Sequence, residues 1–247
     1  MRKPGGQNLT YAIVEELGQA VVTQTYSDDD PFPIEAQLCK QFGASRTVLR
    51  EAVKMLTAKG LLSARPRQGT WVEPESKWNL LDPDVLRWLL ERKFSLDMLA
   101  EFTEVRLAIE PMAAMIAARN ATPASVAPIR NAIERMKAAA NGEDDPLTSD
   151  IAFHVAILHA TGNRFYAQLE DVINAALRTS IRLTNQVKGV RQADVDLHHK
   201  VFNAIEAGNG AKAKALMETI IGEALDLIGT AQRKAKGAAA TARTQRT

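Results

Sequence analysis

The chain has 247 residues, enough for two small domains, and combines 46% hydrophobic residues with only 5% aromatic ones, which favours a packed helical core. No apolar run reaches the roughly 18 residues needed to span a membrane, and the single Cys39 excludes an internal disulfide. The net charge is +2, but it is unevenly distributed: residues 36–72 and 231–247 are basic, and the rest of the chain is acidic. This distribution is expected of a nucleic-acid binder, and a solvated charged surface is the alternative.

The first 76 residues predict three helices followed by a hairpin. Apolar side chains at helical spacing predict helices over residues 9–24, 33–42 and 46–59. Ser45 is a good N-cap for the third helix, and Gly60 is a good stop signal at its end. Two short strands over residues 61–65 and 70–72 then flank a tight turn. This order of elements is typical of a winged helix-turn-helix domain.

The rest of the chain predicts helices alone. Their expected spans are 83–91, 95–120, 123–140, 146–161, 163–186, 191–207 and 210–232. The end of the chain is low in complexity. We therefore expect a mainly α fold with an N-terminal winged helix-turn-helix over residues 1–76, a C-terminal all-α antiparallel helical bundle over residues 77–232, and a disordered basic tail over residues 233–247.

The third helix has a basic face opposite its apolar one. Arg46, Arg50 and Lys54 recur at every fourth residue, with Thr47 beside them. Arginine presents a planar fork that can grip a phosphate or the edge of guanine. Ser45 and Thr47 stand where hydroxyls and backbone amides can reach a phosphate. The pattern predicts a helix that lies in the DNA major groove, and an ordinary solvated helix face is the alternative.

The tip of the hairpin supports the same interpretation. Arg65 and Arg67 flank the turn, and Gly69 closes it. A glycine there would allow the backbone to approach a phosphate or the minor groove closely. We therefore expect the hairpin to be a DNA-contacting wing.

The stretch PIEAQLCKQFGASRTVLREAVKMLTAKGLL, followed by RQGTWV, resembles the DNA-binding domain of the GntR family of bacterial transcription regulators. The resemblance implies DNA contacts by Ser45, Arg46, Thr47, Arg50, Arg67 and Gly69. The family commonly has an arginine directly after the glutamate of its second helix. This chain has Ala36 there, so one phosphate contact is missing.

Two groups of polar residues in the helical region suit a small acidic ligand. Asp150 and His154 are four residues apart, so they project from one helical face and suit either a divalent metal or the polar groups of a ligand. Arg106 lies in an otherwise apolar helix with Glu110 one turn on. An inward arginine is a natural carboxylate clamp, and an internal Arg106–Glu110 ion pair is the alternative. For Asp150 and His154 the alternative is a solvated helix end.

Three stretches of the helical region, residues 104–122, 150–163 and 198–210, resemble the FadR-type, or FCD, effector domain found in the same family. The resemblance implies an effector site at Arg106, Asp150, His154 and His198. It also implies a divalent metal such as zinc, which three histidines and an aspartate usually hold in this fold. Asp150, His154 and His198 match three of those positions, and Ile220 occupies the fourth, so the site lacks one ligand.

Together these likenesses imply a cytoplasmic homodimeric regulator that binds operator DNA. Within the subfamily the layout is most similar to members that respond to sugar acids, so we expect a repressor of a sugar-acid catabolic operon that an acid of the D-galactonate type releases from DNA. One alternative is a regulator of the same family that senses lactate, gluconate or a fatty-acid derivative. Another is an activator in place of a repressor. A metal-dependent hydrolase at Asp150, His154 and His198 is the competing class. The chain has no nucleophile elbow, phosphate loop or HExxH motif, which predicts a protein that is not an enzyme.

Overall fold

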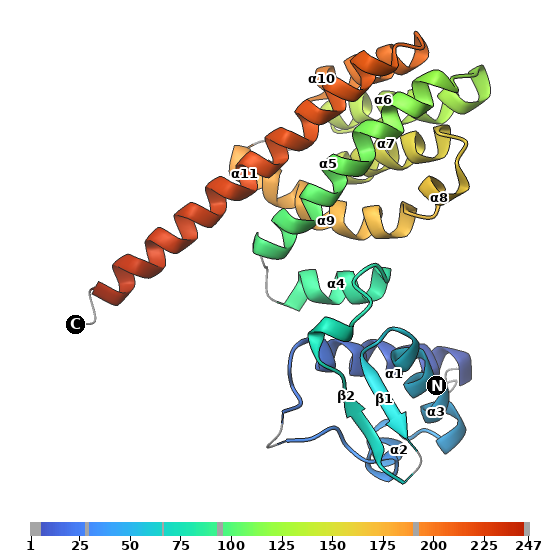
Figure 1. Cartoon of the computed structure of the whole chain (residues 1–247), viewed down its shortest axis with the longest axis vertical. Helices are drawn as coiled ribbons and strands as arrows, with labels where there is room; N and C mark the ends of the chain where they lie inside the picture. The colour runs from blue at the N-terminus through green and yellow to red at the C-terminus, as the bar shows by residue number, and fades with distance from the viewer. Residues whose placement is uncertain (1–5, 28–29, 66, 93–95, 190–192, 245–247) are drawn as a thin grey trace. The chain divides into compact units, whose positions relative to one another are not determined.

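The computed structural model describes residues 6–27, 30–65, 67–92, 96–189 and 193–244 (Figure 1). The chain divides into two compact units, Met1–Phe94 and Ser95–Thr247. The first combines helices with a two-stranded sheet, and the described secondary structure of the second is helical. A mainly α fold with a winged helix-turn-helix before a helical bundle is confirmed.

The first unit follows the predicted order of three helices and a hairpin. Its elements are α1 (Gly6–Val22), α2 (Glu35–Phe42), α3 (Arg46–Ala58), β1 (Leu62–Arg65), β2 (Gly69–Val72), the 3-10 helix η1 (Glu75–Lys77) and α4 (Pro83–Arg92). The strands pair antiparallel, with Leu62 opposite Val72 and Arg65 opposite Gly69. Large apolar side chains from each of the first three helices form the core, among them Leu17, Leu38 and Leu49.

The turn between α2 and α3 places the third helix as the sequence predicts. Gly43 adopts a φ of 58°, a left-handed conformation that glycine adopts without strain and that ends α2. The Ser45 hydroxyl oxygen then accepts a hydrogen bond from the Val48 amide at 3.3 Å and caps α3. Leu49, Ala52 and Leu56 form the buried stripe of α3. Its opposite face is left exposed.

Helix α4 packs within the first unit, although the sequence pattern predicted a boundary before it, at residues 76 and 77. Trp88 of α4 is 2% exposed and lies against α1 at Gly18, where an added Cβ would come within 2.3 Å of the indole ring. The Glu15 carboxylate accepts hydrogen bonds from Arg87 at 2.9 and 2.7 Å and from Trp88 Nε1 at 3.0 Å. These contacts are long-range, so the helical pattern of α4 alone could not assign it to a unit.

The second unit contains α5 (Leu96–Arg119), α6 (Pro123–Ala140), α7 (Pro146–Ala160), α8 (Arg164–Ala167), α9 (Glu170–Lys188), α10 (Val195–Glu206) and α11 (Gly210–Thr244). Long helices α5 and α11 run side by side, and α6 packs on α7 (Figure 1). The single helix expected over residues 163–186 is wrong: α8 and α9 are separate. The break at Gln168 and Leu169 contains neither glycine nor proline, so no breaker marks it in the sequence.

Helix α11 continues to Thr244, into the segment 233–247 for which the sequence predicts a disordered tail. The segment is rich in alanine, lysine and arginine, which have high helix propensity. It also extends an existing helix, which avoids the unfavourable nucleation step. Residues 245–247 lie outside the described part of the chain.

Within the described residues, every helix falls short of the length or the hydropathy required to cross a membrane.

Candidate functional site

The predicted recognition residues lie together on the open face of α3. Ser45, Arg46, Thr47 and Arg50 are all exposed. The side chain of Arg46 is 77% exposed and that of Arg50 is 65% exposed. The geometry therefore leaves both guanidinium groups accessible to a DNA groove.

Glu35, which the sequence analysis missed, holds these arginines. Its carboxylate accepts hydrogen bonds from Arg50 Nε at 2.9 Å and from Arg50 Nη2 at 3.4 Å. The same carboxylate lies 3.6 Å from Arg46 Nε. Glu35 is the first residue of α2, and an acidic residue is common there because it interacts favourably with the helix dipole. The sequence therefore offered no reason to expect Glu35 to contact α3.

The wing has an irregular tip. Arg67 and Gly69 adopt φ values of 65° and 89°, in the left-handed region that side chains other than glycine rarely occupy. A Cβ added to Gly69 would meet nothing within 4 Å, so the backbone conformation and not crowding favours glycine. The Arg65 guanidinium lies 5.5 Å from the centroid of the Trp71 ring, which holds this arginine along the sheet.

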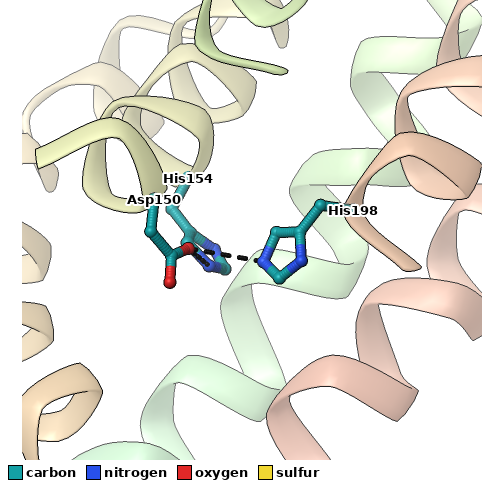
Figure 2. A group of neighbouring side chains, drawn as sticks. All are labelled: Asp150, His154 and His198. Carbon is teal, nitrogen blue, oxygen red and sulfur yellow. Dashed lines mark ion pairs between the residues drawn. The ribbon is translucent and has the colours of Figure 1, made fainter. Parts of the chain in front are cut away.

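The second cluster lies inside the helical unit and brings three predicted residues together (Figure 2). Asp150 and His154 come from α7, and His198 faces them from α10 (Figure 2). Asp150 Oδ1 lies 3.4 Å from His154 Nε2 and 3.3 Å from His198 Nε2. All three side chains are buried, and one ligand atom from each lies within 4.8 Å of the other two. The alternative of a solvated helix end at Asp150 and His154 is therefore wrong.

Two polar atoms of this cluster lie 3.3 Å apart as an ion pair but form no hydrogen bond with any described residue. Among the described residues, Asp150 Oδ1 and His198 Nε2 are buried and form no hydrogen bond. Leaving a buried polar group unpaired costs about 1–3 kcal/mol, so such atoms need an explanation. A cation would satisfy both atoms at once, since a carboxylate oxygen and two imidazole nitrogens are ligands that zinc accepts.

The outer ring nitrogens orient both histidines towards the cluster. Nδ1 of His154 lies 2.5 Å from Glu110 Oε2, and Nδ1 of His198 lies 2.6 Å from the backbone oxygen of Asp194. Acceptors at Nδ1 favour a proton there, so Nε2 is the nitrogen that can bind a metal once it has released its own proton. The donor set and its supports therefore fit a divalent metal with three protein ligands.

Electrostatics couple this cluster to Arg106. Arg106 Nε donates to Glu110 Oε1 at 2.6 Å, so the internal ion pair that was the alternative interpretation of Arg106 does form. Burial would raise the pKa of Glu110, but the charges of Arg106 and His154 outweigh it and lower the pKa to about 2. Burial opposes the charged form of His154, yet Glu110 and Asp150 raise its pKa to about 9. Burial likewise would raise the pKa of Asp150, and the two histidines lower it instead.

A pocket of about 60 Å³ connects these groups, lined by Arg106, Asp150, His154 and His198. Ile220 also lines the pocket, at the place expected for a fourth ligand, and offers no ligand atom.

Sequence reasoning missed other polar residues of this pocket. Lys188 of α9 and Glu223 of α11 line it and form an ion pair at 3.1 Å. Ser180, Thr184 and Asn185 of α9 line it as well. No motif marks these residues, although their spacing along one predicted helix could have suggested a shared polar face.

Comparisons with known proteins agree with both halves of the structure. The model of bacterial regulatory proteins of the gntR family matches residues 9–72, and the model of the FCD domain matches residues 101–223. The galactonate operon transcriptional repressor of Escherichia coli (strain K12) is 33% identical over 215 residues, which cover 87% of this chain and 94% of that protein. The HTH-type transcriptional regulator LutR of Bacillus subtilis (strain 168) is 30% identical over 73% of this chain and 83% of its own.

A solved structure shares the fold. The protein Lar, described as controlling expression of the Listeria monocytogenes agr system, superposes with a TM-score of 0.53 at 14% identity, over 93% of this chain and 99% of its own. At that identity the likeness concerns the fold alone. Because a winged helix and an FCD domain occur together in a chain that is similar to regulators over most of its length, the chain belongs to the GntR family of DNA-binding transcriptional regulators, in the group whose C-terminal half is an FCD effector domain.

Proposed function

We propose that the protein is a homodimeric repressor of a sugar-acid catabolic operon, and that an acid of the D-galactonate type binds in the pocket of the helical unit and releases the DNA. The observation that carries the proposal is the buried cluster of Asp150, His154 and His198 beside Arg106, with two polar atoms that form no hydrogen bond among the described residues. Buried polar atoms that face a pocket are suited to a polar ligand. The similarity to a galactonate operon repressor supports the choice of acid.

Arg106 binds the carboxylate of the effector in this proposal. Its Nε is held by Glu110, which leaves the terminal nitrogens of the guanidinium for a ligand. Asp150 and His154 bind hydroxyl groups, either directly or through a metal that His198 also holds. When bound, the metal supplies a positive centre that attracts carboxylate and hydroxyl oxygens. Because Ile220 replaces the fourth ligand, the affinity for zinc is lower than that of a four-ligand site.

Release of DNA follows from differential affinity. The effector must prefer the arrangement in which the two recognition helices no longer match their half-sites. A fall of ~100-fold in DNA affinity requires a coupling free energy of about 2.7 kcal/mol. One charge-assisted clamp and two hydroxyl contacts supply that much if the DNA-bound form lacks them. By reciprocity, operator DNA weakens effector binding by the same factor.

The cluster acts as a binding site in this proposal and not as a catalytic one. The carboxylate next to His154, Glu110, is engaged by both Arg106 and His154, so it is poorly placed to act as a general base for water. The proteins to which the chain is similar are transcriptional regulators. As a regulator of a bacterial operon the protein works in the cytoplasm, where its DNA is.

A small hydroxy acid such as lactate is the second candidate effector. The specific observation is the pocket of about 60 Å³, which suits a short acid directly. A longer sugar acid needs the pocket to widen, for example by parting the ion pair of Lys188 and Glu223. A fatty-acid derivative needs far more apolar space.

Calorimetry with D-galactonate, D-gluconate and L-lactate tests the proposal, on protein treated with EDTA and on protein reloaded with zinc. The acid that binds must also release a palindromic operator duplex, measured by fluorescence anisotropy. Binding by D-galactonate with release supports the first candidate, and binding by lactate alone supports the second. If no hydroxy acid binds with or without zinc, the effector class is wrong.

A further inference from the structure

Helix α11 is longer than the helix on which it packs. Near its start Gly210 lies against Met115, where an added Cβ would come within 3.0 Å of the backbone oxygen. Further along, Gln232 Nε2 donates to Asp97 Oδ1 at 2.7 Å. The two helices are therefore antiparallel, and α5 begins at Leu96, next to this contact. Residues 233–244 of α11 extend past the start of α5 (Figure 1), a length of about 18 Å.

This extension, residues 233–244, is basic and has no apolar face. It contains Arg233, Lys234, Lys236 and Arg243 and no acidic residue. Arg233 and Lys234 are exposed. Its remaining residues are alanine, glycine and threonine, too small to form the apolar stripe that packs against another helix. A helix of this composition suits an extended anionic partner and not an apolar groove.

The position of the extension in the fold indicates which anion it meets. It leaves the helical bundle at the end where α5 begins, next to Asp97. The chain enters the bundle at that same end, directly after the DNA-binding unit, which ends at Phe94. The helix beside which the extension leaves the bundle is thus the one that directly follows the DNA-binding unit in the sequence.

We propose that the extension of α11 binds phosphates of the DNA that flanks the operator. It adds affinity that does not depend on the base sequence, while α3 and the wing supply discrimination. This inference uses the DNA binding of the family and is independent of the identity of the effector.

The test replaces Arg233, Lys234, Lys236 and Arg243 with glutamine, which retains helix propensity without the charge. The matched control changes Lys234 and Lys236 to arginine, which keeps every charge. Operator affinity is measured by anisotropy from 50 to 200 mM salt, on a duplex with long flanks and on one trimmed to the operator. Circular dichroism confirms that both variants keep their helix content.

On the long duplex we expect the neutral variant to bind several-fold more weakly than the wild type and the control. The slope of log K against log salt should fall by about 0.9 for each phosphate that the variant no longer neutralises. On the trimmed duplex the variants should bind alike, and the ratio of operator to scrambled DNA should stay unchanged. A chain that ends at Gln232 should behave as the neutral variant does.

An unchanged salt slope on the long duplex overturns the proposal. So does a changed oligomeric state in light scattering with unaltered DNA binding, which would make a second copy of the chain the partner. Reduced discrimination between operator and scrambled DNA would also overturn it, because the extension would then read bases. Failure of every hydroxy acid to bind leaves this test unaffected, so the two proposals fail separately.

Discussion

Arginine–glutamate pairs occur at both candidate sites, in opposite surroundings. On α3, Arg50 and Glu35 pair at the surface, with the arginine side chain 65% exposed. In the helical unit, Arg106 and Glu110 pair with side chains only 3% and 2% exposed. An exposed pair contributes about 0–1 kcal/mol and can exchange its partner for a phosphate or a base. A buried pair cannot be opened at one side without leaving an uncompensated charge. The same pair of residue types is therefore exchangeable on the exposed face of α3 and fixed beside the buried pocket.

The largest effect is expected when the buried pair is broken. Arg106→Ala leaves Glu110 with His154 as its remaining charged partner among the described contacts, so the free energy of unfolding should fall by about 3–5 kcal/mol. Urea denaturation measures this decrease. Replacing both Arg106 and Glu110 with leucine should be far less harmful, because no unpaired charge is left. A decrease below about 1 kcal/mol for Arg106→Ala would show that the pair is not buried in solution.

The same variant tests the carboxylate clamp in whatever fraction remains folded. Folded Arg106→Ala should still bind the operator, since α3 and the wing lie in the other unit, but it should no longer be released by the effector. Anisotropy on a labelled operator reports both properties. Release at the wild-type effector concentration would place the clamp on another residue, with Lys188 the next basic group that lines the pocket.

Changes to the metal ligands should come next in size. His198→Ala removes one of three candidate ligands and should abolish measurable zinc binding in calorimetry. Ile220→His should have the opposite effect, because it supplies a ligand at the fourth position, and should tighten zinc binding by about tenfold or more, equivalent to ~1.4 kcal/mol. Ile220→Leu is the matched control for a change of shape without a ligand. Equal zinc affinity in wild type, Ile220→His and Ile220→Leu would mean that position 220 does not face the metal.

Removing one recognition arginine should have a moderate effect. Arg46→Ala or Arg50→Ala should weaken operator binding by about 1–3 kcal/mol if the side chain contacts a base edge. The discrimination against scrambled DNA should fall as well, since the variant can no longer read that base. Lys54→Ala is a suitable comparison, because Lys54 lies on the same helix and is not among the residues predicted to contact DNA. Operator affinity equal to wild type in both arginine variants would remove α3 from the major groove.

The smallest effect is expected for Glu35→Gln. The ion pairs with Arg46 and Arg50 are exposed to solvent, which screens them, so the stability of the unit should barely change. Removal of a negative charge near the DNA should raise affinity for scrambled DNA. If Glu35 also orients Arg50, the affinity for operator should rise less than the affinity for scrambled DNA. The ratio of the two affinities should then fall. A ratio unchanged from wild type would leave Glu35 with a charge effect alone.

Several parts of the molecule could be predicted because their causes are local. The spacing of apolar residues and the cap at Ser45 predicted α3, and the turn residues predicted the wing. The placement of Asp150 and His154 on one face followed from their spacing of four residues. The break between α8 and α9 was missed because it contains no glycine or proline, so the sequence carries no local signal for it.

What the sequence determined by itself is therefore most of the helices, the hairpin and the basic face of α3, since short-range sterics and a period of 3.6 residues decide them. The tertiary structure alone brought His198 of α10 to Asp150 of α7 and left one atom of each without a hydrogen bond to any described residue in a buried site. It alone placed Glu35 against Arg50, and Trp88 of α4 against Gly18 of α1. These contacts join residues far apart in the chain, and they form because helices must bury their apolar faces against one another, which no local pattern encodes.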